Sequence, residues 1–129
     1  MSKTPARVLI VDDSPIVRAM HEYIFQAAGF DTLQAESGFL ALEALQRAPC
    51  DLAIVDINMP LMDGLTLVRQ IRAETAMREL PIIIVTTEED AGDQEKAFDA
   101  GANAYLVKPT DPADLVEQAR LLLGAAGRL

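Results

Sequence analysis

Four short apolar runs, each followed directly by a polar residue, constrain the fold of this chain more than any other feature. The runs and the residues that follow them are 8–11 before Asp12-Asp13, 52–55 before Asp56, 82–85 before Thr86, and 105–107 before Lys108. None alternates between apolar and polar residues, which is typical of strands buried on both faces of a parallel sheet. Because the carboxyl ends of parallel strands lie along one edge, we expect these polar residues to meet there.

Helical segments separate the strands. Ser14-Pro15 and Asp111-Pro112 each combine a capping residue with a proline at the first helical position. We predict helices over residues 15–28, 38–48, 63–74, 88–100 and 111–123. Residues 31–35 form a half-polar strand that suits a sheet edge. This alternation predicts an α/β fold, an open, doubly wound parallel sheet with helices on both faces.

Length and composition favour a single domain. The chain has 129 residues, half of them hydrophobic, so we predict one domain over residues 1–129 with a frayed tail at 124–129. No apolar stretch approaches the ~20 residues of a membrane-spanning helix, and the start lacks a signal-peptide apolar region. With a single cysteine, this favours a cytoplasmic location and no membrane insertion. A formal net charge of −9 and scattered basic residues argue against direct nucleic-acid binding.

The residues at the expected sheet edge suit phosphoryl chemistry. Asp12, Asp13 and Asp56 repel one another when close, and a divalent cation converts that repulsion into attraction. Carboxylates are ligands for a hard ion, so Mg²⁺ is the expected metal. Lys108 and Thr86 add a positive charge and a hydroxyl donor that suit phosphoryl oxygens. Asp56, alone at the end of a strand expected to be central, is the candidate nucleophile that forms an acyl phosphate.

The motifs resemble those of the receiver domain of two-component response regulators, over essentially the whole chain. The matching features are an acidic pair at 12–13, the segment 56–64 around Asp56, the switch hydroxyl Thr86, the switch aromatic Tyr105, and Lys108-Pro109. The resemblance implies a flavodoxin-like, five-stranded sheet in the order 2-1-3-4-5. It also implies a cis peptide bond before Pro109.

The resemblance assigns a role to each residue of the site. Asp56 is the phosphoacceptor, and the donor is a phosphohistidine on a sensor histidine kinase. Mg²⁺ is held by Asp13, Asp56 and the backbone carbonyl of Asn58, while Asp12 acts mainly through metal-bound water. Lys108 steadies the phosphoryl group.

The resemblance also implies a switch. Thr86 moves to bond the phosphoryl group, and Tyr105 fills the space that Thr86 leaves. Helix 88–100 has a thin apolar stripe, so we expect it to lie at the low-stability end of the fold. We expect the face formed by helix 88–100, the Tyr105 strand and the last helix to bind a downstream protein. Asn58, Thr87 and Glu88 are expected to border access to the phosphoryl group.

Several functions remain open on this sequence. The first is a stand-alone regulator, monomeric or weakly dimeric, that acts on a motor or another effector, as in chemotaxis. Such a protein catalyses its own phosphorylation and dephosphorylation and is not ordinarily classed as an enzyme. A phosphorelay shuttle or a kinase-feedback receiver is the alternative. A Mg²⁺-dependent aspartyl phosphatase and a flavin-binding module of similar architecture fit the first loop less well.

His21 and Cys50, the histidine and the cysteine of the chain, lie outside these motifs. His21, alone in the first helix, is predicted to be a solvated or half-buried side chain without a functional role. Cys50, next to Pro49 at the entrance of a strand, is predicted to be an inert packing residue.

Overall fold

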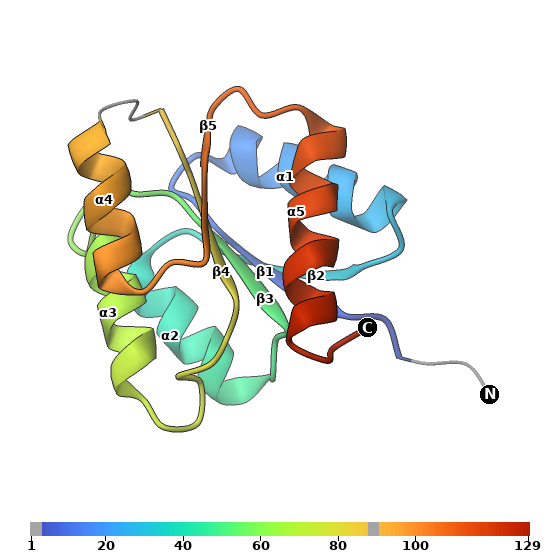
Figure 1. The fold of residues 1–129 in the computed structure, drawn as a ribbon, viewed down its shortest axis with the longest axis horizontal. Coiled ribbons are helices and arrows are strands. Elements are labelled where there is room, and N and C mark those ends of the chain that lie inside the picture. The colour runs from blue at the N-terminus through green and yellow to red at the C-terminus, as the bar shows by residue number, and fades with distance from the viewer. Residues whose placement is uncertain (1–3, 88–90) are drawn as a thin grey trace.

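Strands and helices alternate strictly in this computed structural model, which describes residues 4–87 and 91–129 (Figure 1). The strands are β1 (Arg7–Val11), β2 (Asp31–Ala35), β3 (Leu52–Val55), β4 (Ile82–Thr86) and β5 (Ala104–Val107). The helices are α1 (Pro15–Ala27), α2 (Gly38–Arg47), α3 (Gly64–Ala73), α4 (Ala91–Ala100) and α5 (Pro112–Ala125). The strands pair in parallel in the order β2-β1-β3-β4-β5. The predicted doubly wound fold and strand order are therefore confirmed, with β2 at an edge.

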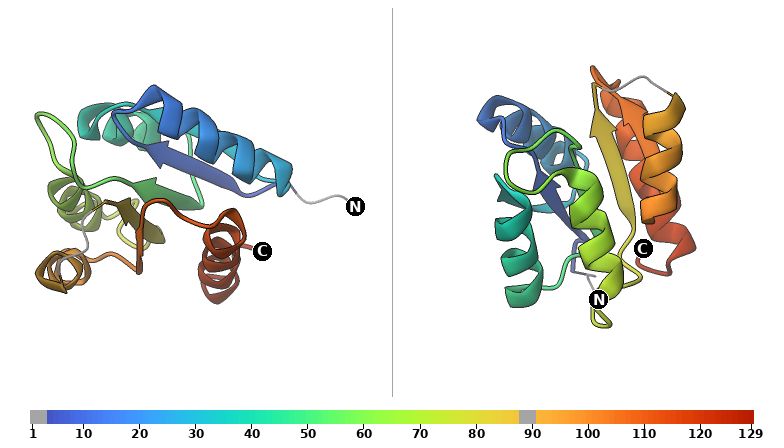
Figure 2. Two further views of the ribbon diagram at one scale, coloured as in Figure 1. Left: turned by 90° about the horizontal axis from the view of Figure 1, so that it is seen from above. Right: turned by 90° about the vertical axis from the view of Figure 1, so that its left-hand side faces the viewer.

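The sheet lies between two layers of helices (Figure 2). Leu9 of β1 belongs to one buried cluster with residues of α2, α3 and α4, such as Leu67. Val8, the preceding residue, belongs to the opposite cluster with Phe25 of α1 and Leu115 of α5. Successive side chains of one strand thus enter different cores, which is why the strand sequences are apolar without alternation.

Capping residues explain where the helices begin. Ser14 Oγ accepts a hydrogen bond from the Val17 N–H at 3.3 Å, and Asp63 Oδ1 accepts one from the Thr66 N–H at 2.8 Å. Such caps satisfy amide groups that the first helical turn leaves without partners. No helix in the described ranges is long and apolar enough to cross a membrane.

The last helix ends at a different residue from the predicted one, and the predicted start of the fourth helix cannot be compared. Helix α5 continues through Ala125, and beyond it the Arg128 N–H donates to the Leu123 carbonyl at 2.8 Å. The Arg128 guanidinium also donates to the Cys50 carbonyl at 3.2 Å, so part of the tail predicted to fray is attached to the β3 entrance. The first three residues of the predicted helix 88–100 lie outside the described residues.

His21 differs from its sequence-based prediction, because it is buried with only 2% of its surface exposed. Its Nδ1 atom has no hydrogen-bond partner in the described part of the chain. Burial lowers the pKa of His21 below its ordinary value of 6.5, and the positive charge of Lys108 lowers it further, against a smaller opposing effect of Asp12. The side chain is therefore neutral at neutral pH.

We expect His21→Leu to remove a pH dependence of stability. A base with a lowered pKa in the folded state contributes stability that is fully present above its unfolded pKa of 6.5 and is lost as pH falls below it. The contribution of His21 should decline by up to about 1.4 kcal/mol per pH unit, and the variant should lack that decline. Urea unfolding of both proteins on either side of pH 6.5 measures this; parallel curves would contradict it.

Candidate functional site

Backbone hydrogen bonds bring the four strand ends together. The Asp56 N–H donates to the Val11 carbonyl at 3.0 Å, which joins the end of β3 to that of β1. The Lys108 N–H donates to the Thr86 carbonyl at 2.8 Å, which joins the end of β5 to that of β4. The polar residues that follow the strands therefore lie on one edge of the sheet, as predicted from the apolar runs.

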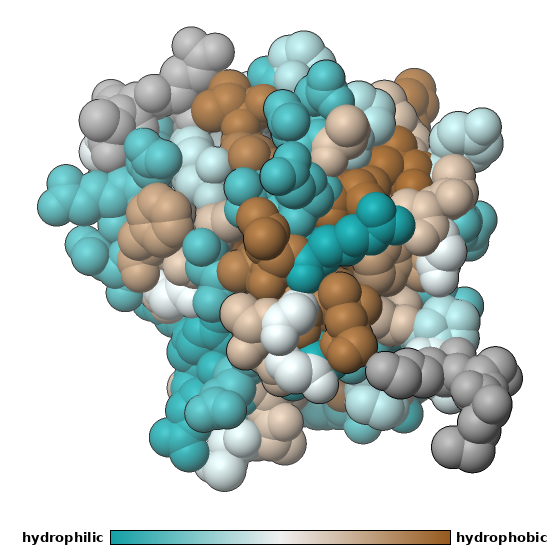
Figure 3. Space-filling model, turned by 45° about the vertical axis from the view of Figure 1, so that its right-hand side comes forward, coloured by the Kyte–Doolittle hydropathy of each residue, from teal (hydrophilic) through white to brown (hydrophobic). Residues whose placement is uncertain are grey.

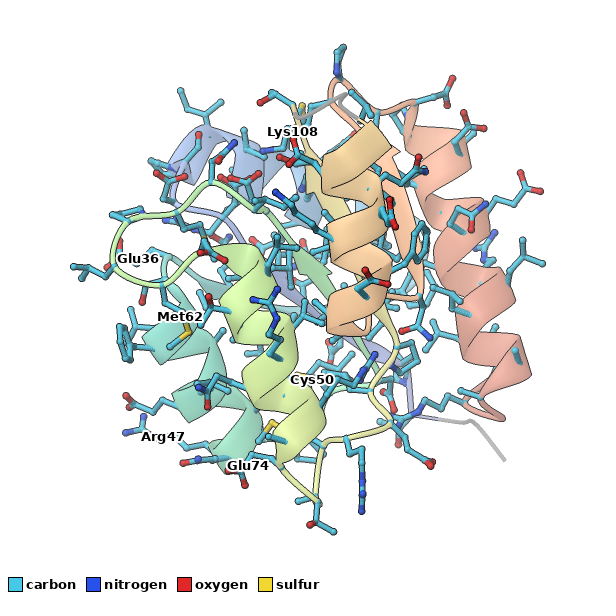
Figure 4. All side chains as sticks on the ribbon, turned by 60° about the vertical axis from the view of Figure 1, so that its left-hand side comes forward. Glu36, Arg47, Cys50, Met62, Glu74 and Lys108 are labelled. Carbon is cyan, nitrogen blue, oxygen red and sulfur yellow. The ribbon has the colours of Figure 1, made fainter. Side chains whose placement is uncertain are left out.

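Three carboxylates form a cluster on this edge. One oxygen each of Asp12, Asp13 and Asp56 lies within 4.8 Å of the others. Asp12 and Asp56 are buried, whereas Asp13 is exposed. The Lys108 ammonium lies 2.7 Å from Asp12 Oδ2 and 3.5 Å from Asp56 Oδ1, and Figure 4 shows Lys108 at this end of the molecule. One ammonium is thus paired with two of the three carboxylates.

Every polar group of Asp12 is engaged. Its N–H donates to the Ala35 carbonyl at 3.2 Å, and its own carbonyl accepts from Arg18 Nη1 at 2.6 Å. Its Oδ1 accepts from the Ser14 N–H at 2.9 Å, and its Oδ2 accepts from Lys108. This saturation favours Asp12 as an orienting residue and leaves Asp13 and Asp56 with greater freedom to bind a cation.

Arg18 is a residue of the site that the sequence analysis missed. Besides its bond to the Asp12 carbonyl, its Nε donates to Gln34 Oε1 at 3.0 Å, so it links the acidic turn to β2. A basic residue one turn into the helix after an acidic pair was the available signal. The signal is weak, because the contact to Gln34 depends on strand pairing.

Asp56 is held in an environment that disfavours its charge. Burial raises the pKa of Asp56 above its ordinary value of 3.8; Lys108 opposes the rise, and the negative charge of Asp12 adds to it. The ionised carboxylate is therefore stabilised less by the protein than by water. A cation bound at Asp56 would relieve this unfavourable burial.

The donor set fits a divalent cation that prefers oxygen. Mg²⁺ takes oxygen ligands, carboxylates among them. One oxygen from each of the three carboxylates lies within 4.8 Å of the others, so they are close enough to share one ion. Nitrogen and sulfur ligands are lacking among the described residues of the cluster, which disfavours zinc. Asp13 and Asp56 are the residues that would hold the ion.

Thr86 brings an unsatisfied hydroxyl to the site. The residue is fully buried at the end of β4, and its Oγ1 has no hydrogen-bond partner within the described ranges. The hydroxyl is nevertheless near enough to Asp56 to favour the ionised carboxylate slightly. A buried hydroxyl without a partner costs free energy, so a new acceptor at Asp56 would stabilise it.

We expect Thr86→Val to stabilise the unphosphorylated protein by about 1 kcal/mol, because it removes a buried hydroxyl without a partner. Urea unfolding measures the change. Thr87→Val is the matched control, since Thr87 is exposed and its substitution should leave stability unchanged. A loss of stability in Thr86→Val would mean that the hydroxyl already has a partner.

The loop after Asp56 is shaped by close backbone contacts. The Gly64 N–H donates to the Ile57 carbonyl at 2.8 Å and closes the loop. Met62 packs over Gly38 of α2, where a Cβ atom would meet the Met62 sulfur, and Figure 4 shows Met62 against that helix. Asn58 is exposed within the loop. Several residues of the 56–64 motif therefore serve the backbone geometry around Asp56.

The remaining predicted residues lie around this centre. Tyr105 is half-buried on β5 and packs against the core on the α4 side. Thr87 is exposed directly after β4. Glu88 lies outside the described residues. The Lys108–Pro109 peptide bond is cis, as the resemblance implies.

The fold and the acidic edge define a phosphorylation-dependent signalling module, and sequence comparison agrees. The chain belongs to the response regulator receiver domain family, whose model matches residues 8–120. Receiver domains bind Mg²⁺ in an acidic pocket, and Asp12, Asp13 and Asp56 form an acidic cluster that could bind a metal ion.

Its relatives include proteins of similar length. The chain is 40% identical over 120 residues to the chemotaxis protein CheY1 of Helicobacter pylori. The aligned region covers 92% of this chain and 97% of that relative. It is 35% identical over 113 residues to chemotaxis protein CheY-3 of Vibrio cholerae, covering 87% of each. The solved structure of Vibrio cholerae chemotaxis protein CheY4 matches with a TM-score of 0.89 at 35% identity, covering 93% of this chain and 100% of that one.

Proposed function

We propose that this chain is a phosphorylation-activated switch in which Asp56 accepts a phosphoryl group from a phosphohistidine of a sensor kinase. The observation that carries the proposal is the arrangement around Asp56. Its buried carboxylate lies beside Lys108 and near a hydroxyl, that of Thr86, which has no partner in the described part of the chain. This arrangement favours a group that brings phosphoryl oxygens to Asp56.

In the proposed reaction, an Asp56 oxygen attacks phosphorus, the bond between phosphorus and the donor imidazole nitrogen breaks, and an acyl phosphate forms. Mg²⁺, when held by Asp13, Asp56 and the Asn58 carbonyl, supplies positive charge to the phosphoryl oxygens. Lys108 donates hydrogen bonds to the same oxygens from its place between Asp12 and Asp56. Asp12, whose two carboxylate oxygens already accept hydrogen bonds, keeps Lys108 and the acidic turn in position.

The acyl phosphate then changes the surface. Thr86 donates to a phosphoryl oxygen, and Tyr105 moves into the space that Thr86 leaves. Helix α4 and β5 shift with them, so the face of α4, β5 and α5 becomes the binding site for a downstream protein. A phosphate analogue with Mg²⁺ should change amide chemical shifts across residues 91–106. If those residues are untouched while others respond, this proposal is wrong.

We infer that the output is chemotaxis signalling in the cytoplasm, through a motor or another effector protein. The inference is supported by the similarity to chemotaxis proteins over almost their whole length. Transfer of the phosphoryl group from this chain onto a histidine phosphotransfer protein would instead indicate a phosphorelay shuttle.

Intact mass spectrometry after incubation with acetyl phosphate and Mg²⁺ tests the phosphoacceptor. We expect one added phosphoryl group on the wild type, none on Asp56→Asn, and none without Mg²⁺. Asp63→Asn is the matched control, because Asp63 is an exposed aspartate of the same loop and should leave the mass shift intact. A mass shift retained in Asp56→Asn would overturn the assignment.

We expect Asn58→Ala to shorten the lifetime of the acyl phosphate by at least about twofold, because the side chain borders the path of attacking water. The exposure of Asn58, two residues after Asp56, supports this position. The decay of the phosphorylated mass after removal of the phosphodonor measures the lifetime. Equal decay rates in wild type and variant would refute the role.

A further inference from the structure

The negative charge of this chain is concentrated in one segment. Residues 87–118 contain nine acidic residues and two lysines, so this segment carries seven of the nine excess negative charges of the chain. One of the two lysines, Lys108, is directed into the site, where it bonds to Asp12 and does not neutralise the surface. The segment includes α4, β5 and the start of α5, which form the proposed output face.

Five described acidic side chains of this segment are exposed to solvent, whereas Asp93 is half-buried. We call the exposed residues Glu95 and Asp99 of α4 and Asp111, Asp114 and Glu117 at the start of α5 the acidic face. Lys96 is the exposed cation among them.

The arginines of the C-terminal helix and tail lie away from the acidic face. Arg120 donates to the Ala28 carbonyl at 3.2 Å and lies 5.9 Å from the centre of the Phe30 ring, beside α1. Arg128 is bound to the Cys50 carbonyl and to Asp51 at the opposite edge of the sheet. Neither arginine therefore compensates the carboxylates of α4 and α5.

Large apolar side chains accompany the acidic ones. Phe98 on α4 is 45% exposed and stands next to Asp99 and one turn after Glu95. Leu121 on α5 is 59% exposed and lies two turns after Asp114, on the same side of the helix. In Figure 3, apolar side chains are interspersed with hydrophilic ones on the side of the molecule that includes α5. Such a surface offers apolar contact within a negative field.

The charge excludes several partners for this face. Nucleic acid and anionic lipid headgroups carry the same sign and would be repelled. A second copy of this chain that used the same face would place carboxylates against carboxylates. A protein segment of opposite charge remains, and charge complementarity would also accelerate its association.

We propose that the acidic face binds a basic protein segment whose lysine or arginine residues flank apolar side chains that contact Phe98 and Leu121. This inference rests on the proposed output face and adds the chemistry of its partner. Rim charges act chiefly on the association rate and its salt dependence, while the apolar contacts limit dissociation.

Two synthetic peptides test the proposal. Both have leucines at the same spacing, but one carries lysines and its twin carries glutamates at the other positions. Each is titrated into isotope-labelled protein activated by beryllofluoride and Mg²⁺. We expect the basic peptide to bind at least about tenfold more tightly, with shifts confined to α4, β5 and α5 and an affinity that falls as salt rises. Equal affinities of the twins, or shifts centred on α2 and α3, would overturn it.

Charge-neutralised variants distinguish binding at the acidic face from an effect of the overall negative charge of the chain. We expect the affinity for the basic peptide to fall at least about fivefold in a variant that combines Glu95→Gln, Asp99→Asn and Glu117→Gln. The matched control combines Glu36→Gln, Glu74→Gln and Glu79→Gln, exposed residues outside the acidic face, of which Glu36 and Glu74 are labelled in Figure 4 beside α2 and α3. An equal loss in the control, or no loss in the first variant, refutes the proposal. The chemical shift of the Thr86 amide reports activation separately. If activation fails, this shift reveals it, and the comparison of the two peptides still tests the charge preference of the acidic face.

Discussion

Lys108→Met should slow phosphorylation of Asp56 by acetyl phosphate at least about a hundredfold, because it removes a preorganised cation from the phosphoryl oxygens. It should also lower the free energy of unfolding by about 3 kcal/mol at neutral pH. The reason is that Lys108 lies 2.7 Å from Asp12 and 3.5 Å from Asp56, and both carboxylates are buried. Without the ammonium, two close negative charges lack their nearest compensating charge.

Intact mass against time measures the first effect of Lys108→Met, and urea unfolding measures the second. Lys96→Met is the matched control, because Lys96 is an exposed lysine of α4 and should change neither quantity. Millimolar Mg²⁺ should restore part of the stability, since the cation supplies positive charge to the same carboxylates. Equal stability of variant and wild type without Mg²⁺ would contradict the described ion pairing.

Gly64→Ala should lower the free energy of unfolding by about 3 kcal/mol through overpacking against the backbone. A Cβ atom on Gly64 would collide with the Asp56 carbonyl oxygen and would lie 2.8 Å from its carbonyl carbon. These atoms are backbone and cannot rotate away, so the loop after Asp56 must shift. We therefore expect slower phosphorylation as well, since the shift displaces Asp56, the proposed phosphoacceptor.

Gly124→Ala is the control for this substitution. A Cβ atom at Gly124, within α5, would have no neighbour within 4 Å. Alanine is favoured over glycine in a helix by about 1 kcal/mol, so this variant should be slightly more stable than wild type. Urea unfolding of both variants separates the steric effect from the loss of glycine flexibility. Wild-type stability in Gly64→Ala would show that the loop accommodates the methyl group without cost.

Local signals made much of the fold and the site predictable. The apolar runs identify strands because both faces of β1, β3 and β4 are covered by helices. The caps at Ser14 and Asp111 locate helix starts because a cap acts on amides two or three residues away. Asp12, Asp13, Asp56 and Lys108 were predicted to meet because each lies within two residues of the end of a strand, and the structure brings them together.

Contacts between residues distant in sequence decided the rest. The Arg18 link from Asp12 to Gln34 and the attachment of Arg128 to Cys50 each join separate elements. His21 is buried, although as a lone histidine in a helix it was predicted to be solvated or half-buried. Such features depend on which surfaces pack together after the sheet has formed.

The sequence by itself thus determined the alternation of strands and helices, the strand ends that carry the chemistry, and the concentration of negative charge in residues 87–118. Only the tertiary structure decided that both Asp12 oxygens are engaged, that the Thr86 hydroxyl lacks a partner in the described part of the chain, and that Gly64 lies against the Asp56 carbonyl. The physical reason is the distance along the chain over which each kind of interaction acts. Periodicity and capping act over a few residues, whereas the burial and hydrogen bonding of one side chain depend on packing between segments far apart in the chain.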